Sequence, residues 1–160
     1  MNLEELSKKE LLLSETAGTF NGKIDQDYLI ILNAEFNDIF DKYSSLSTDN
    51  LEALKRGLFL IWYNVSEPEF LTGISELNQL SKYKIINLIE NLIIQNRIDY
   101  ELDWMLSHYK NWDYVFEPFK SNNIFYNYLI NSETEFPEII NRESMAQRGL
   151  MGKYWNSLNK

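Results

Sequence analysis

The hydrophobic residues of this chain recur mainly at the spacing of helices. The most apolar helical run is 82–98, where the large side chains follow a 3.6-residue period and widen beyond a single face. These side chains are Tyr83, Ile85, Ile86, Leu88, Ile89, Leu92, Ile93, Ile94 and Ile98. A buried strand is the alternative for so many β-branched residues, but the run is too long and lacks alternation. The pattern therefore predicts a central helix, capped by Ser81, around which the other helices pack.

Similar spacing predicts helices on both sides of this run. We expect helices at 3–15 (short and fraying), 24–43, 50–65, 66–77, 99–109, 111–132 (broken near 121–123) and from Pro137 onward, with a loop at 16–23. Ser47, Thr48 or Asp49 is the expected cap at 50, and Asp99 the expected cap of its helix. Ser66 and Glu69 have the spacing of a capping box, with Pro68 in the first turn. Gly149 and Gly152 are expected to loosen the last helix.

These elements amount to seven or eight mostly antiparallel helices joined by short loops. We expect a single all-α domain over residues 1–160, either a bundle or a short HEAT-like helical stack. A weak internal echo bears on that choice, because five residues recur 50 positions later. Asp49, Trp62, Val65, Glu67 and Pro68 return as Asp99, Trp112, Val115, Glu117 and Pro118. A unit of this length fits a helical repeat, although coincidence also explains five matches.

Composition narrows the class of protein. The 160 residues are 44% hydrophobic and 24% charged, which is typical of a globular domain. The absence of cysteine excludes disulfides, thiolate nucleophiles and cysteine-built metal sites. The first 15 residues mix acids and lysines with leucines, unlike a signal peptide, and the apolar run 58–63 is far too short for a membrane span. We expect a cytoplasmic protein with no membrane contact.

Charge is distributed unevenly along the chain. The net charge is −9, whereas the segment 142–160 holds four basic residues against one acidic residue, so the rest carries −12. An acidic body repels nucleic acid and attracts basic partners, although acidity also serves solubility alone. The basic, aromatic end of the chain, 148–155, is expected to dock onto the acidic body rather than onto nucleic acid.

The residues that could carry catalysis are few. His108 is the only histidine, and neither a nucleophile nor an orienting carboxylate is paired with it in the pattern, which favours a structural histidine. The GTFNG stretch at 18–22 lacks the phosphate-loop lysine and the dinucleotide fingerprint. We therefore predict no catalytic residue and no cofactor.

Two groups of acids resemble metal ligands but fail the required pattern. Asp99, Glu101 and Asp103 alternate like a calcium loop, yet the sixth and twelfth places are not Gly and Glu. Asp38 and Asp41 are stacked on one helix face, but a di-iron site needs two Glu-x-x-His pairs and the chain has one histidine. We predict no metal, and we interpret the 38–41 face as an acidic docking surface or a solvated face.

Aromatic residues are crowded between 100 and 128, which holds ten of them. Trp112, Tyr114 and Phe116 point in different directions around a helix, so they cannot all share one face. The alternatives are a core that uses both faces or an aromatic binding surface, since Tyr and Trp often anchor protein interfaces.

These observations favour a protein-interaction module. The small, acidic, cysteine-free chain has the general character of an immunity protein or antitoxin-like neutraliser that binds a basic protein partner. The predicted partner-binding residues are Asp38, Asp41, Trp112, Tyr114 and Phe116. One alternative is a helical-repeat scaffold that presents a groove to peptides or to several partners. The other is an enzyme or small-molecule binder with an aromatic pocket near His108.

Overall fold

The computed structural model describes residues 1–19 and 25–159, and this part of the chain is a single all-helical domain without strands. The all-α prediction is confirmed. The described elements are nine α-helices and two 3₁₀ segments. They are α1 (Leu3–Gly18), α2 (Gln26–Leu46), α3 (Leu51–Ser66), α4 (Glu69–Thr72), α5 (Gln79–Ile94), α6 (Tyr100–Tyr109), η1 (Lys110–Val115), η2 (Glu117–Phe119), α7 (Asn123–Asn131), α8 (Arg142–Ala146) and α9 (Gly149–Leu158).

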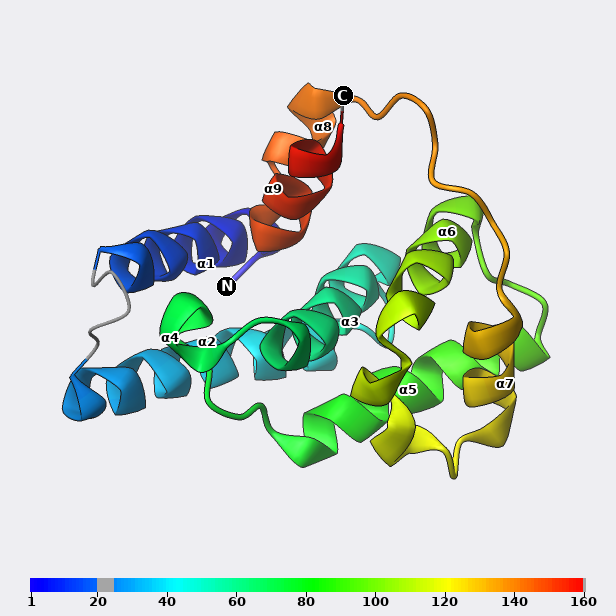
Figure 1. Cartoon of the computed structure of the whole chain (residues 1–160), viewed down its shortest axis with the longest axis horizontal. Coiled ribbons are helices and arrows are strands. Elements are labelled where there is room, and N and C mark those ends of the chain that lie inside the picture. Colours follow the sequence, from blue (N-terminus) through cyan, green and yellow to red (C-terminus); the bar gives the residue numbers. More distant parts are fainter. Residues whose placement is uncertain (20–24, 160) are drawn as a thin grey trace.

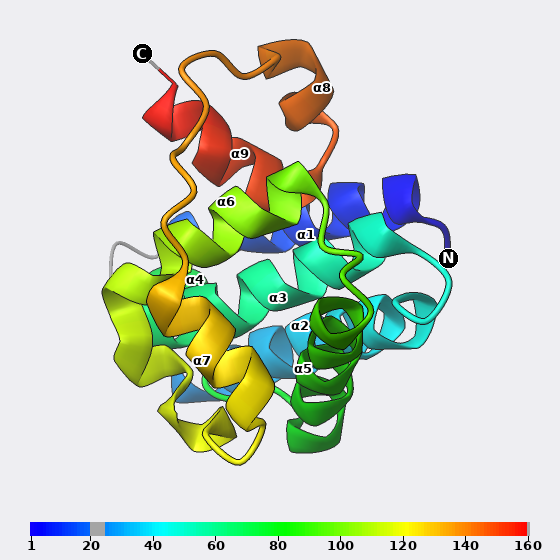
Figure 2. The same cartoon turned by 90° about the vertical axis from the view of Figure 1, so that its right-hand side faces the viewer.

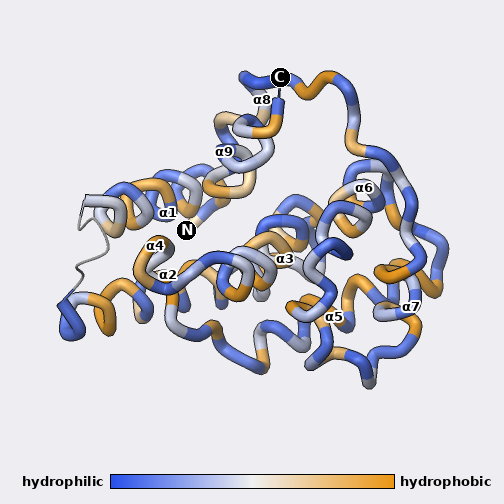
Figure 3. The backbone as a smooth tube through the Cα atoms, viewed as in Figure 1, coloured by the Kyte–Doolittle hydropathy of each residue, from blue (hydrophilic) through white to orange (hydrophobic). Residues whose placement is uncertain are grey.

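Helix α3 lies at the centre of the domain, with α2 and α5 on one side and α1 and α9 on the other (Figures 1 and 2). Every residue from Ala53 to Trp62 is buried, so α3 is covered on all sides. Gly57 permits part of this packing, because a Cβ there would lie 2.4 Å from Cδ1 of Ile85 on α5. Hydrophobic and hydrophilic residues alternate along most of the other helices, which bury one side only (Figure 3).

The prediction that the 82–98 run forms the central helix is wrong. This run forms α5, which buries four side chains along one stripe and leaves Ile94 60% exposed. The helix ends at Ile94, and Asn96 then adopts a positive φ of 53°, which stops the helix before Ile98. Apolar content therefore overstated the burial of α5, because burial depends on how many neighbours cover a helix.

Asparagine or aspartate caps each described helix that has a side-chain cap at its N-terminus. Asn2 and Glu5 form a capping box at α1, and Asp99 accepts from Leu102 N at α6, as predicted. Asn50 caps α3 in place of Ser47, Thr48 or Asp49. At α5 the cap is Asn78 rather than Ser81.

The predicted capping box at Ser66 does not form, and the helix expected over 66–77 is only the single turn α4. Pro68 occupies the N-cap position of α4, and no side chain caps it. The Ser66 hydroxyl is buried and has no hydrogen-bond partner among the described residues. Gly73 ends α4 in the left-handed region at φ 77°.

Two helices receive their caps from another helix. The N-cap residues of α7 and α9 make no side-chain cap bond. Instead, Phe125 N on α7 donates to Glu90 of α5 at 3.0 Å, and Leu150 N on α9 donates to Glu10 of α1 at 2.6 Å. A carboxylate at a helix N-terminus satisfies orphan amides and complements the helix dipole. These contacts fix α7 on α5 and α9 on α1.

The helix expected from Pro137 onward does not begin there. Residues 132–141 form a non-helical segment, here called the strap, that runs from α7 to α8 (Figures 1 and 2). Phe136 anchors the strap, since its ring lies 5.0 Å from that of Trp104 and 5.7 Å from that of Trp155. Pro137 disfavours the helical region for this anchored residue, which helps to keep the chain extended.

The glycines of the last helix tighten its packing rather than loosen it. Gly149 begins α9 with φ 64°, and a Cβ on it would lie 2.7 Å from a carboxylate oxygen of Glu10. A Cβ on Gly152 would lie 1.7 Å from the carbonyl oxygen of Met145. Only glycine allows α9 to approach α1 and α8 this closely.

The 50-residue echo does not correspond to a structural repeat. Trp62 lies inside α3, whereas Trp112 lies in η1 with non-helical φ and ψ of −121° and 53°. The loop predicted at 16–23 begins later, because α1 continues to Gly18, and residues 20–24 lie outside the described part of the chain. Among residues 1–19 and 25–159, no helix combines the length and apolar character needed to cross a membrane.

Candidate functional site

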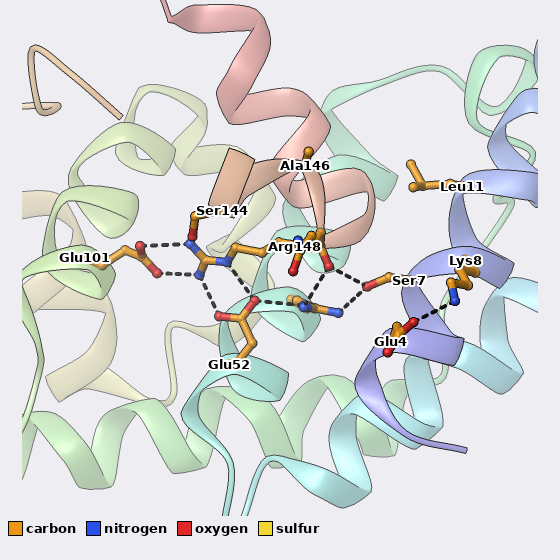
Figure 4. Close-up of a pocket in the computed structure, with 11 residues that line it drawn as sticks. Glu4, Ser7, Lys8, Leu11, Glu52, Glu101, Ser144, Ala146 and Arg148 are labelled. Atoms are coloured by element: carbon orange, nitrogen blue, oxygen red, sulfur yellow. Dashed lines mark hydrogen bonds and ion pairs between the residues drawn. The ribbon is translucent and has the colours of Figure 1, made fainter. Parts of the chain in front are cut away.

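An open groove of about 960 Å³ lies between α1, α3, α6 and the α8–α9 connection (Figure 4). Its floor is a network of charged side chains. The lining residues are Glu4, Ser7, Lys8, Leu11, Glu52, Arg56, Glu101, Ser144, Ala146, Gln147 and Arg148.

Arg148 is the centre of this network and binds two carboxylates at once. Its Nε and Nη2 donate to Glu52 at 2.8 and 2.6 Å, and its Nη1 and Nη2 donate to Glu101 at 2.9 and 2.5 Å. Glu52 belongs to α3 and Glu101 to α6, whereas Arg148 lies between α8 and α9. Bidentate pairs of this kind are strong and directional. Arg148 therefore ties the C-terminal helices to the body, as expected for the basic end of the chain.

Arg56 extends the network toward α1. Its Nε donates to Glu52 at 2.8 Å, and its Nη1 donates to the Leu3 carbonyl and to Ser7 Oγ. Lys55 on the same helix pairs with Asp99 at 2.7 Å and with Glu101 at 3.0 Å. The desolvation of Glu101 raises its pKa, but hydrogen bonds from Arg148 and Lys55 outweigh this and lower the pKa to about 2.

The charged groups of the groove bind one another and connect helices, and they lack the arrangement of an active site. All the N–H groups of Arg148 point at protein acceptors, so little donor capacity remains for an anionic ligand. The Ser7 hydroxyl accepts from Arg56 and donates to the Gln147 carbonyl, so no base activates it. The network therefore holds α1, α3, α6 and the α8–α9 connection together.

Glu10 lies beneath α9 and is almost completely buried. It accepts from Tyr43 Oη at 2.7 Å and from Leu150 N at 2.6 Å. Burial raises the pKa of Glu10 to about 7, against these hydrogen bonds and the nearby Arg56 charge, which lower it. No sequence pattern marks this residue, because within α1 it resembles any other surface glutamate.

His108 lies in the aromatic core and matches the expectation of a structural histidine. Its Nε2 lies 2.7 Å from Tyr154 Oη, and rings of Trp62, Trp112 and Trp155 surround it at centroid distances of 5.0–6.1 Å. Burial lowers the pKa of His108 to about 4. Within the described chain no carboxylate bonds to its ring, and no three His, Asp or Glu side chains group as a metal site.

The predicted acidic residues on α2 are engaged within the chain. Asp38 forms ion pairs with Lys42 at 2.7 Å and with Lys9 at 3.3 Å. The hydrogen bond from Lys42 lowers the pKa of Asp38, which burial alone would raise. Asp41 accepts from Ser81 Oγ at 2.5 Å and from Asn78 Nδ2 at 3.4 Å, so it fixes the start of α5. Asp38 is therefore paired with two lysines of the same chain, and Asp41 is held by two neutral donors.

The predicted aromatic residues in η1 and directly after it differ in exposure. Tyr114 is 52% exposed, Trp112 is half-buried against Trp62, and Phe116 is fully buried against Tyr109 and Phe125. Phe116 therefore cannot contact a partner in this structure, because the turn after η1 directs it into the core. Most of the aromatic crowding between 100 and 128 is core packing, with Tyr100 and Tyr114 as the exposed exceptions.

The five predicted residues do not form one surface. Asp38 and Asp41 lie on α2, which packs on α1, α3 and α5. Trp112 and Tyr114 lie on η1, which packs on α3, α6, α7 and η2, and Phe116 directly follows η1. Of the set, Tyr114 remains on the surface without the internal pairing that occupies the two aspartates.

Three acids without an ion pair lie on the strap, which the prediction missed. Glu133, Glu135 and Glu138 are exposed, and among the described residues none has an ion-pair partner. A signal was present in the sequence, because the run 133–138 contains three acids, one proline and no cation.

Compared with known protein families, curated proteins and solved structures, the chain gives no match. Function is therefore argued from the geometry of the residues.

Proposed function

We propose that this protein is a protein-binding module that captures a basic protein partner, in the manner of an immunity protein or antitoxin-like neutraliser. The observation that supports it is the uneven pairing of charges. Seven described cations are engaged with acids of the same chain, while the strap keeps its carboxylates free. These cations are Lys8, Lys9, Lys42, Lys55, Arg56, Lys120 and Arg148.

Exposed aromatic and apolar residues occur on η1 and on the strap. Tyr114 and Asp113 of η1 are exposed, and Ile139 of the strap is 85% exposed. The two segments adjoin, since Lys110 at the start of η1 donates to the Ser132 carbonyl at the start of the strap. Free acids speed the capture of a basic partner, and apolar contacts then slow its release.

The test is capture of the partner at two salt concentrations. We expect the tagged protein to retain one stoichiometric basic protein from its native extract, and to retain less at about 0.5 M salt, where surface charges are screened. The purified protein should then inhibit the activity of that partner. Several unrelated partners would favour the scaffold alternative, and capture that is independent of salt would contradict the electrostatic mechanism.

A matched variant links the capture to the strap. Glu133, Glu135 and Glu138 are changed together to glutamine, and the control changes Glu15, Asp27 and Glu143, which are also exposed, to their amides. Both variants lose three negative charges, so they differ only in location. The strap variant should lose most of the captured partner, whereas the control should retain it.

A further inference from the structure

A small acidic cavity opens beside the first residues of the strap. It has a volume of about 260 Å³ and is lined by Asp103, Tyr128, Asn131, Ser132, Glu133 and Thr134. These residues come from α6, α7 and the strap, which meet at this point. Pockets for whole small molecules are usually larger, roughly 300–1,000 Å³, so this cavity suits a single side chain.

The hydrogen-bonding capacity left in this cavity is mainly that of acceptors. Asp103 already accepts from Tyr128 Oη and from Thr134 Oγ1, both at 2.6 Å, which directs those two hydroxyl hydrogens at the carboxylate. A carboxylate has about four acceptor positions, so about two remain. Asn131 donates its amide to Asn127 O, which leaves its side-chain oxygen as an acceptor.

Two further groups of the cavity lack partners in the described structure. The Ser132 hydroxyl is buried without a hydrogen bond, which is unusual because buried polar groups are nearly always satisfied. Glu133 is exposed at the rim without an ion pair. Lys110 contacts the same segment, but its amine donates to the Ser132 carbonyl.

We propose that this cavity receives an arginine side chain of the basic partner, whose chain then continues along the strap past Glu135 and Glu138. A guanidinium matches the cavity because it carries five donors and no acceptor. The backbone groups of residues 133–139 make no hydrogen bonds to other described backbone groups, so they are free to pair with an extended partner segment. This inference rests on the proposed function and names the surface that carries it out.

Binding of a labelled hexa-arginine peptide to the full-length protein tests the cavity. We expect the double variant Glu133→Gln, Glu135→Gln to weaken binding about tenfold, since each partly exposed ion pair contributes up to about fivefold. The control Glu15→Gln, Glu143→Gln carries the same charge change on other surfaces and should alter binding less than about twofold. Equal weakening by both variants would show that only net charge matters and would overturn the proposal.

A second measurement locates the peptide independently of any variant. Backbone amide resonances of residues 131–135 should shift on titration of hexa-arginine into the wild-type protein, while those around Glu15 should not. Shifts elsewhere, or replacement of the peptide by hexa-lysine without loss of affinity, would contradict a guanidinium site.

Failure of this proposal is distinguishable from failure of the proposed function. If wild-type protein captures a basic partner and the double variant retains it equally, the cavity is not the anchor, although the protein still binds a basic partner. If wild-type protein captures no basic partner, the proposed function fails, and the arginine site fails as a partner anchor with it.

Discussion

The groove under Arg148 and the strap both contain several carboxylates, yet they use them differently. In the groove, Glu52 and Glu101 each bind a cation of the same chain at hydrogen-bonding distance, and the helices they join are distant in sequence. On the strap, Glu135 and Glu138 point to solvent without a described cation. Paired acids hold a structure together, whereas unpaired acids shape the field that a partner meets.

The close approach of α8 and α9 that forms the groove is the most sensitive feature. Replacing Gly152 with alanine places a Cβ 1.7 Å from a backbone oxygen, and backbone cannot move aside cheaply. We expect Gly152→Ala to lower the free energy of unfolding by about 3 kcal/mol or more, measured by urea denaturation. Gly18→Ala is the control, because its Cβ meets nothing within 4 Å and should be neutral or slightly stabilising. Similar stability of both variants would contradict this packing.

Loss of the Arg148 network is expected to have the next largest effect on stability. Arg148→Ala leaves two partly buried glutamates without their shared cation, and we expect a loss of about 3 kcal/mol by the same denaturation measurement. Arg142→Ala removes an arginine whose described contact is a carbonyl of Asn159 on the surface, and should cost less than about 0.5 kcal/mol. If both substitutions lower the free energy of unfolding equally, the Arg148 network does not hold these helices together.

Glu10 makes the packing of α9 on α1 dependent on pH. Because its pKa is raised from 4.5 to about 7, the folded chain binds more protons than the unfolded chain between these values, so the free energy of unfolding falls as the pH rises through this window. The loss amounts to roughly 3 kcal/mol in total. Glu10→Gln should remove it, which is measured as the difference between variant and wild type from pH 4 to 8.

The variant must be compared with wild type at each pH, because another group that titrates in the same range changes the free energy of unfolding in the opposite direction. The pKa of His108 is lowered to about 4 by burial, so its contribution to stability rises with pH between 4 and 6.5. A stability difference between Glu10→Gln and wild type that stays constant with pH would contradict the assignment to Glu10.

The smallest expected effect on stability belongs to the strap. Glu135→Gln together with Glu138→Gln removes two exposed carboxylates without described partners and should change the free energy of unfolding by less than about 0.5 kcal/mol. The same variant should weaken partner capture. A large loss of stability would show that these acids hold the fold together, and the contrast with the groove would disappear.

Local pattern predicted much of the helical framework. The periodicity at 24–43 and 50–65 marked α2 and α3 within a few residues, and Asp99 was identified as a cap because its neighbours follow helical spacing. The same reasoning gave a wrong prediction at Pro137, because proline is common at the start of a helix as well as in extended chain. What decided between the two was the packing of Phe136 on Trp104 and Trp155, which is non-local.

The candidate sites depended more on tertiary contacts than the fold did. The sequence by itself determined that the chain is helical, acidic, without cysteine and with one histidine, because these follow from composition and period. Only the tertiary structure decided which acids are engaged. Asp38 meets Lys9 from another helix, Glu10 caps α9, and Glu52 shares Arg148 with Glu101, in each case through residues separated by at least 29 positions. Charge pairing depends on distances of a few ångströms between side chains, and sequence separation does not contain that information.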